Sequence, residues 1–244
     1  MSTPNPSPSL KGREPIALKQ RAKQAFLDTF EALRQMARPV LAIQATAVLL
    51  VVAFYLSPQV REVSATLAKW NQAGGLLGAA ITTVVASVAI PRIFTAIVGW
   101  KQPKQDSKDF LFELGYWVFI GVEIRLFYSL QSLIWGDAPT FATVAKKVAF
   151  DMLVFTACWN MPVSALMFLW RDRGFSGKRT AEAIKEGDLV PRIAAFIVGA
   201  VGFWLVMVSA IYSLPYDVQF VLFLLAQAAW ALILLAMDRA KRAT

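Results

Sequence analysis

Long apolar runs dominate the hydrophobic pattern of this chain. A helix that crosses a bilayer needs about 20 largely apolar residues, and six stretches come close to that length. The first, fifth and sixth carry no charge, the second is interrupted late by Pro91 and Arg92, and the third and fourth contain ionisable residues. The predicted spans are 39–56, 75–99, 110–135, 148–170, 193–212 and 218–237. The pattern therefore predicts an all-α, polytopic membrane helix bundle of about six spans, extending over 39–237.

The basic residues between the apolar runs indicate the orientation. Lys and Arg concentrate before residue 39, between the second and third spans, between the fourth and fifth, and after residue 237, whereas the segment between the first two spans holds only Arg61 and Lys69. Positive charge is retained on the cytoplasmic side of a membrane. Six spans place both termini there, and a bacterial inner membrane fits this pattern, with an organellar membrane as the alternative.

The residues before the first span divide into two parts. Residues 1–13 are rich in Ser and Pro and are expected to be disordered. The segment 14–38 has apolar residues at three- and four-residue steps, which predicts an amphipathic helix on the inner membrane surface; a helix that caps the bundle and a docking site for a partner are the alternatives. The short tail 238–244 is basic. The basic residues expected to contact anionic lipid or a partner are Lys19, Arg21, Lys23, Arg34, Arg171 and Arg173.

Composition narrows the chemistry further. Of the 244 residues, 57% are hydrophobic and 17% charged, well below the charged fraction of a soluble domain. The chain has no His and one Cys, so it offers no imidazole ligand or base and no internal disulfide. No phosphate-binding loop, dinucleotide motif or nucleophile system is recognisable, so no enzyme activity, metal or cofactor is expected. The net charge of +9 fits positive-inside loops better than nucleic-acid binding.

Polar residues within the predicted spans are the candidate site, because ionisable groups in a membrane usually face protein or water. Glu123 and Arg125 are two residues apart, so they point in different directions on one helix and each needs its own partner elsewhere. Asp151 follows Lys147 by four residues and is expected to form either an ion pair with it or one with Arg125 on another helix. Arg92 is expected to extend to the inner surface. The candidate pathway or interhelical contacts are Glu113, Glu123, Arg125, Tyr128, Asp151 and Asn160.

The second half of the chain resembles a known family. Residues 121–130 read Gly-Val-Glu-Ile-Arg-Leu-Phe-Tyr-Ser-Leu, which is similar to the Gly-Pro-x-x-His-x-Trp-Tyr pattern of the Mpv-seventeen/peroxisomal-membrane-protein family. The segment 146–151 resembles that family's Lys-x-x-x-Asp-Gln, and Pro215 and Trp230 have a similar spacing around the last helix. The resemblance covers about residues 109–237. It implies a helical bundle without known catalytic residues, and some members of the family are described as channels for small solutes.

Several signature positions differ from the family pattern. Val122 stands where the family has proline, Arg125 where it has histidine, Phe127 where it has tryptophan and Met152 where it has glutamine. Tyr128 and Asp151 keep the polar signature. If these positions line a pathway, Arg125 would favour anions or close the route through an ion pair.

Two functions are compatible with the sequence. The first is a small-solute or anion pathway through the bundle, which requires polar residues from several helices to face one cavity. The second is a non-catalytic structural or accessory subunit of a larger membrane complex, in which the basic segments contact other subunits or anionic lipid. The uncharged first, fifth and sixth spans argue against a pathway and for the accessory role.

Overall fold

The computed structural model describes residues 18–35, 37–100 and 105–243, and over these ranges the chain is helical throughout, without strands. Within them, five helices are long and apolar enough to cross a membrane. They are Ala37–Leu56, Gly75–Ile97, Phe141–Asp172, Leu189–Tyr212 and Tyr216–Ile233. Over the described ranges the protein is therefore all-helical, and its five apolar helices fit an integral membrane protein. The predicted tail 1–13 lies outside the described residues. Of the predicted tail 238–244, the helical backbone is described up to residue 243, but the side chains are not.

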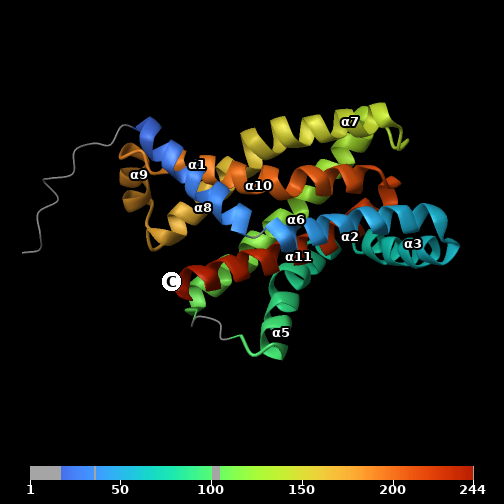
Figure 1. Ribbon diagram of the computed structural model, residues 1–244, viewed down its shortest axis with the longest axis horizontal. Helices are drawn as coiled ribbons and strands as arrows, with labels where there is room; N and C mark the ends of the chain where they lie inside the picture. The colour runs from blue at the N-terminus through green and yellow to red at the C-terminus, as the bar shows by residue number, and fades with distance from the viewer. Residues whose placement is uncertain (1–17, 36, 101–104, 244) are drawn as a thin grey trace, which may run out of the picture.

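The helices form an elongated bundle (Figure 1). α2 (Ala37–Leu56), α10 (Leu189–Tyr212) and α11 (Tyr216–Ala243) run along its length, and α10 and α11 pack side by side. The turns after α2, after α6 (Ser107–Trp135) and after α10 meet at one end of the bundle. The short helix α9 (Gly177–Lys185) and the end of α11 lie at the opposite end.

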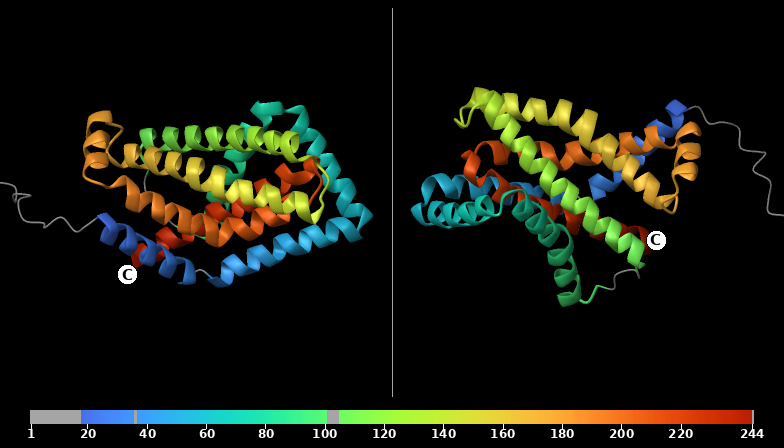
Figure 2. Two further views of the ribbon diagram at one scale, coloured as in Figure 1. Left: turned by 90° about the horizontal axis from the view of Figure 1, so that it is seen from above. Right: turned by 180° about the vertical axis from the view of Figure 1, so that it is seen from behind.

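The segment after the first span is itself a helix, α3 (Pro58–Ala73), where the sequence suggested only a loop. The side chain of Ser57 accepts a hydrogen bond from the amide of Val60, and Pro58 occupies the first helical turn, where its missing N–H costs nothing. α3 folds back along α2 and packs against α11. Figure 2 shows this hairpin of α2 and α3 extending beyond the rest of the bundle.

The long helices Gly75–Ile97 and Phe141–Asp172 each contain a proline near the middle or the end, and each has a π-helical segment just before that proline. The segment η1 (Val85–Ala89) connects α4 (Gly75–Val84) to α5 (Ile90–Ile97), which contains Pro91. The longer segment η2 (Asp151–Asn160) connects α7 (Phe141–Phe150) to α8 (Met161–Asp172), which contains Pro162. A proline ring clashes with the carbonyl four residues earlier, and a wider turn relieves that clash. The helix therefore continues through each proline.

α6 corresponds to the predicted third span but is not among the five helices that are apolar enough to cross a membrane. It carries the charged residues Glu113, Glu123 and Arg125. Its 29 residues nevertheless lie within the bundle, packed along α4 and joined by a short turn to α7. Each of the three charged side chains has a hydrogen-bonding or ionic partner on another helix. Such pairing lowers the cost that these charges would carry in a membrane.

The amphipathic segment forms α1 (Leu18–Gln35), which packs against α10. Thr29 of α1 lies beside Gly199 of α10, where the absence of a side chain permits close approach. Phe26 and Phe30 remain about half exposed. α1 thus packs against the bundle, which agrees with the alternative prediction of a capping helix. The predicted contact of α1 with the membrane surface stays a prediction.

The crossing of α4 and α6 depends on Gly121. A Cβ atom at this position would lie 2.7 Å from the carbonyl oxygen of Ala79 and 2.7 Å from the hydroxyl of Thr83. The carbonyl belongs to a helix backbone and cannot yield locally. We expect Gly121→Ala to lower the free energy of unfolding by roughly 1–3 kcal/mol through overpacking, measured as thermal unfolding in detergent.

Gly115 provides the matched control on the same helix. An added Cβ there meets no atom within 4 Å. Since alanine is the better helix former, Gly115→Ala should be neutral or slightly stabilising. Equal loss of stability in both variants would show that the close α4–α6 crossing is not what constrains position 121.

Candidate solute-binding cavity

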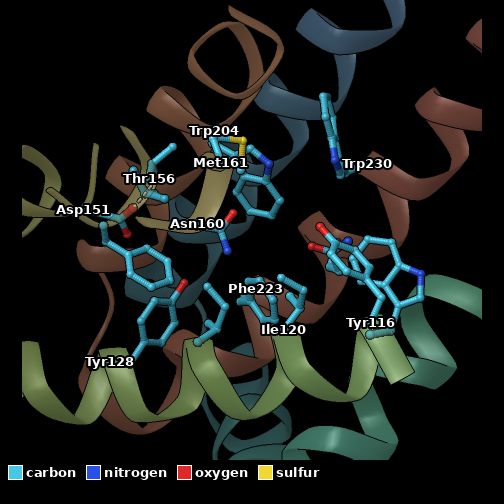
Figure 3. Close-up of a pocket in the computed structure, with 15 residues that line it drawn as sticks. Tyr116, Ile120, Tyr128, Asp151, Thr156, Asn160, Met161, Trp204, Phe223 and Trp230 are labelled. Atoms are coloured by element: carbon cyan, nitrogen blue, oxygen red, sulfur yellow. Dashed lines mark hydrogen bonds between the residues drawn. The ribbon is translucent and has the colours of Figure 1, made fainter. Parts of the chain in front are cut away.

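A cavity of about 80 Å³ lies inside the bundle, between α6, η2, α8, α10 and α11 (Figure 3). Its lining spans residues 116–128 of α6 and 151–161 of the continuous helix Phe141–Asp172, which is close to the middle of both. Pockets between the helices of a bundle are common ligand sites. The position and the lining make this cavity the candidate functional site.

A chain of hydrogen bonds forms one side of the cavity. The amide nitrogen of Gln131 donates to the hydroxyl of Tyr212 at 2.6 Å, and that hydroxyl donates to the carboxylate of Asp151 at 2.5 Å. The hydroxyl of Thr156 donates to the other oxygen of Asp151 at 3.0 Å. Asp151 and Thr156 line the cavity, whereas Gln131 and Tyr212 support them from behind. The chain joins α6, η2 and α10 and fixes the position of the carboxylate.

Asn160 points toward the centre of the cavity (Figure 3). Its amide nitrogen donates to Glu123 at 2.9 Å, and the indole nitrogen of Trp159 donates to the other oxygen of the same carboxylate. These bonds hold the Asn160 amide with its nitrogen toward α6. The Asn160 carbonyl oxygen is then the group that a bound molecule can reach, since an amide offers both donor and acceptor atoms.

The opposite side of the cavity carries a buried amide whose nitrogen has no partner. Gln227 of α11 is 2% exposed, and its amide nitrogen forms no hydrogen bond with the residues that the structure describes. Tyr116, on the facing helix α6, shares a hydrogen bond of 3.0 Å with Ser164. An unpaired amide in such a place costs free energy unless something binds it, so this wall also points to a polar occupant.

Aromatic rings supply most of the remaining wall. Trp204 and Trp230 lie above the centre of the cavity in Figure 3, and Phe223 and Tyr128 lie below it. Trp204 and Phe223 are stacked with ring centroids 6.0 Å apart, and Tyr128 meets Phe223 edge to face at 6.1 Å. These contacts lock the rings around the cavity.

Three of the six candidate residues meet here and three do not. Tyr128, Asp151 and Asn160 line the cavity, and Glu123 stands directly behind Asn160. Glu113 instead forms an ion pair of 2.7 Å with Arg92. Arg125 donates to Asn71 of α3 at 2.9 Å and lies over the ring of Phe220 at 5.5 Å. As expected, Glu123 and Arg125 have separate partners on different helices.

Two expected pairings are wrong. Asp151 accepts from Tyr212 and Thr156 rather than pairing with Lys147 or Arg125. The ammonium of Lys147 lies 3.8 Å from Asp137, in the turn before α7, although the backbone N–H of Asp151 still bonds to the carbonyl of Lys147 as in an α-helix. The guanidinium of Arg92 binds Glu113 on α6 and Gln105 at an exposed position, and its extension to the inner surface stays a prediction.

The predicted basic contacts lie near one end of the bundle. Arg171 and Arg173 at the end of α8 have acidic neighbours, Asp172 and Asp188 respectively, and Arg192 also pairs with Asp172. The Arg173–Asp188 and Arg192–Asp172 pairs tie the end of α8 to the start of α10, and all three pairs partly neutralise the basic charge. Lys23 and Arg34 of α1 are exposed, with Arg34 3.8 Å from Glu31. The side chains of Lys19 and Arg21 lie outside the described residues.

The sequence interpretation missed polar residues of the uncharged helices. Tyr212 of α10 and Gln227 of α11 are buried at or beside the cavity, and Gln44 of α2 donates to the carbonyls of Gly202 and Phe203. Neutral amides and hydroxyls in an apolar run were the available signal. These helices therefore contribute more polar groups to the core than their lack of charge suggested.

Comparisons with known proteins gave no match. No protein family model, no curated protein and no solved structure matches it. Within the described residues no cluster of three or more Cys, Asp or Glu side chains could hold a metal ion.

Proposed function

We propose that this protein provides a route for small polar solutes across its membrane, with the central cavity as the solute-binding site. The observation that carries the proposal is the convergence of polar groups from four helices at mid-length of the bundle: Tyr128 (α6), Asp151, Thr156 and Asn160 (η2), and Gln227 (α11), with Tyr212 (α10) behind them. Polar side chains inside a membrane are costly and mark solute or ion pathways. Sites near the middle of the membrane are typical of transport proteins.

The proposed topology has six spans with both termini in the cytoplasm, α6 being the sixth membrane helix. In support, α6 is long enough to cross, its charges are paired within the bundle, and the turn at 136–140 lies at the end opposite α9 (Figure 1). In a Cys158→Ser background, a single cysteine at Asp137 should react with a membrane-impermeant reagent added outside cells, and one at Lys178 should not. The reverse labelling pattern would contradict this orientation.

The resemblance to the Mpv-seventeen/peroxisomal-membrane-protein family supports the same proposal, and we propose a distant membership. The two polar signature residues that the chain retains, Tyr128 and Asp151, line one cavity. Gly121 of the same signature lies at the α4–α6 crossing. Arg125, which departs from the pattern, contacts Asn71 and Phe220 outside that lining. We therefore do not assign solute selection to Arg125.

Flux through reconstituted liposomes tests the proposal. We expect liposomes that contain the purified protein to admit urea or methylammonium faster than empty liposomes, as followed by stopped-flow light scattering. The cavity volume limits solutes to a few non-hydrogen atoms, so sucrose should stay excluded. Equal rates with and without protein would overturn the proposal, and co-purification with a fixed set of other membrane proteins would then favour an accessory subunit.

A further inference from the structure

We propose that the cavity selects small organic cations that carry N–H groups, the size of methylammonium or guanidinium. The inference rests on the proposed role of the cavity as a solute site and names its substrate class. It follows from the sign of the charge at the cavity, the hydrogen-bonding groups that face it, the aromatic wall and the volume.

The charge at the cavity favours a cation. Asp151 is the ionisable acid among the lining residues, and the lining contains no Lys or Arg. Lys147, one turn away, lies 3.8 Å from Asp137, and Arg125 is bound to Asn71. Glu123, bonded to Asn160, is a second carboxylate next to the lining. A carboxylate has about four lone-pair sites, so each Asp151 oxygen can accept another hydrogen bond beside those from Tyr212 and Thr156.

On the Asp151 side the free hydrogen-bonding groups are acceptors, whereas the amide nitrogen of Gln227 is a free donor elsewhere in the lining. The Asn160 nitrogen is engaged by Glu123, which leaves its carbonyl oxygen for a ligand. The hydroxyl of Tyr128 points toward the same space (Figure 3). An ammonium or guanidinium group is a pure donor and matches this set, whereas an anion would meet a carboxylate and a carbonyl oxygen. The ligand's N–H groups are thus expected between Asp151 and Asn160.

The aromatic wall strengthens the preference for a cation. Three tryptophans, Trp117, Trp204 and Trp230, line the cavity together with the ring of Tyr128. Tryptophan has the most favourable ring face for a cation, and the attraction grows when the pair is shielded from water. A cation in the cavity is therefore expected to gain from the ring faces next to it as well as from the carboxylate.

The volume favours small ligands. The cavity of about 80 Å³ is roughly half the 150 Å³ that accommodates benzene in an engineered protein cavity, and equals about two to three water volumes. Methylammonium and guanidinium, with two and four non-hydrogen atoms, fit this space. A tetramethylammonium ion is larger and has no N–H to donate, so we expect it to bind weakly.

Equilibrium binding to the purified protein in detergent tests the inference without depending on flux. We expect radiolabelled methylammonium to bind the wild-type protein saturably, and uncharged methanol not to compete at equal concentration. Asp151→Asn, which keeps the shape and removes the charge, should weaken binding about tenfold or more, equivalent to about 1.4 kcal/mol. Asp28→Asn is the control, because it removes an exposed acid on α1, outside the cavity, and should leave binding unchanged.

The possible outcomes separate this inference from the proposed function. Methylammonium binding without flux would support the cation site and overturn the transport role. Urea flux without saturable methylammonium binding would leave the transport role standing and overturn the cation site. The comparison of methylammonium with methanol uses only the wild-type protein, so it decides the question even if Asp151→Asn does not fold.

Discussion

Val208→Phe should abolish solute flux in reconstituted liposomes while the protein still folds. Val208 lies on α10, is 4% exposed and lines the cavity. A phenyl ring in its place occupies much of a space of only about 80 Å³. We expect the flux to fall roughly tenfold or more, toward that of empty liposomes. The phenyl ring and the solute would compete for the same space, and overpacking of about 1–3 kcal/mol would weaken solute binding by that factor. Stopped-flow light scattering with urea measures the effect.

Val206→Phe is the matched control for this experiment. Val206 lies two residues away on the same helix, is 39% exposed and faces away from the cavity. A larger apolar side chain on that surface contacts lipid, so flux should equal that of the wild type. If Val208→Phe retains full flux in a folded protein, the solute does not pass through this cavity and the proposed route is wrong.

The apolar spans and three cavity residues could be predicted from the sequence because both leave local signals. Runs of apolar residues of sufficient length specify membrane helices regardless of how they pack. Tyr128, Asp151 and Asn160 stand out as polar groups within such runs, and a polar group in a span must face protein or water. These two rules need no knowledge of neighbouring helices.

The partners of the polar residues could not be predicted, because they depend on packing between helices far apart in the chain. Arg92 and Glu113 approach each other through the crossing of α4–α5 with α6, and Asp151 meets Tyr212 across η2 and α10. The π-helical turns before Pro91 and Pro162 also change the angular offset of later residues. Helical spacing predicted a pair between Asp151 and Lys147, whereas the structure places the Lys147 ammonium 3.8 Å from Asp137.

Tyr212→Phe should cause the largest loss of stability among conservative changes near the cavity. The Tyr212 hydroxyl accepts from Gln131 at 2.6 Å and donates to Asp151 at 2.5 Å, and all three residues are buried. Phenylalanine keeps the ring but leaves the Gln131 amide without an acceptor and Asp151 with Thr156 as its remaining described donor. We expect the free energy of unfolding to fall by roughly 2 kcal/mol. A single hydrogen bond in a membrane is worth about 0.6 kcal/mol on average, but here two buried groups lose their partner together.

The decisive comparison is with Tyr216→Phe, measured as thermal unfolding in the same detergent. Tyr216 also hydrogen-bonds through its hydroxyl, to Ser129 at 2.8 Å, but that bond lies at an exposed position where water can replace it. Its loss should shift the unfolding temperature little, since an exposed partner is not left unsatisfied. If the two variants unfold at the same temperature, the chain from Gln131 through Tyr212 to Asp151 does not stabilise the bundle. The position of the Asp151 carboxylate would then have to be set by η2 and Thr156 alone.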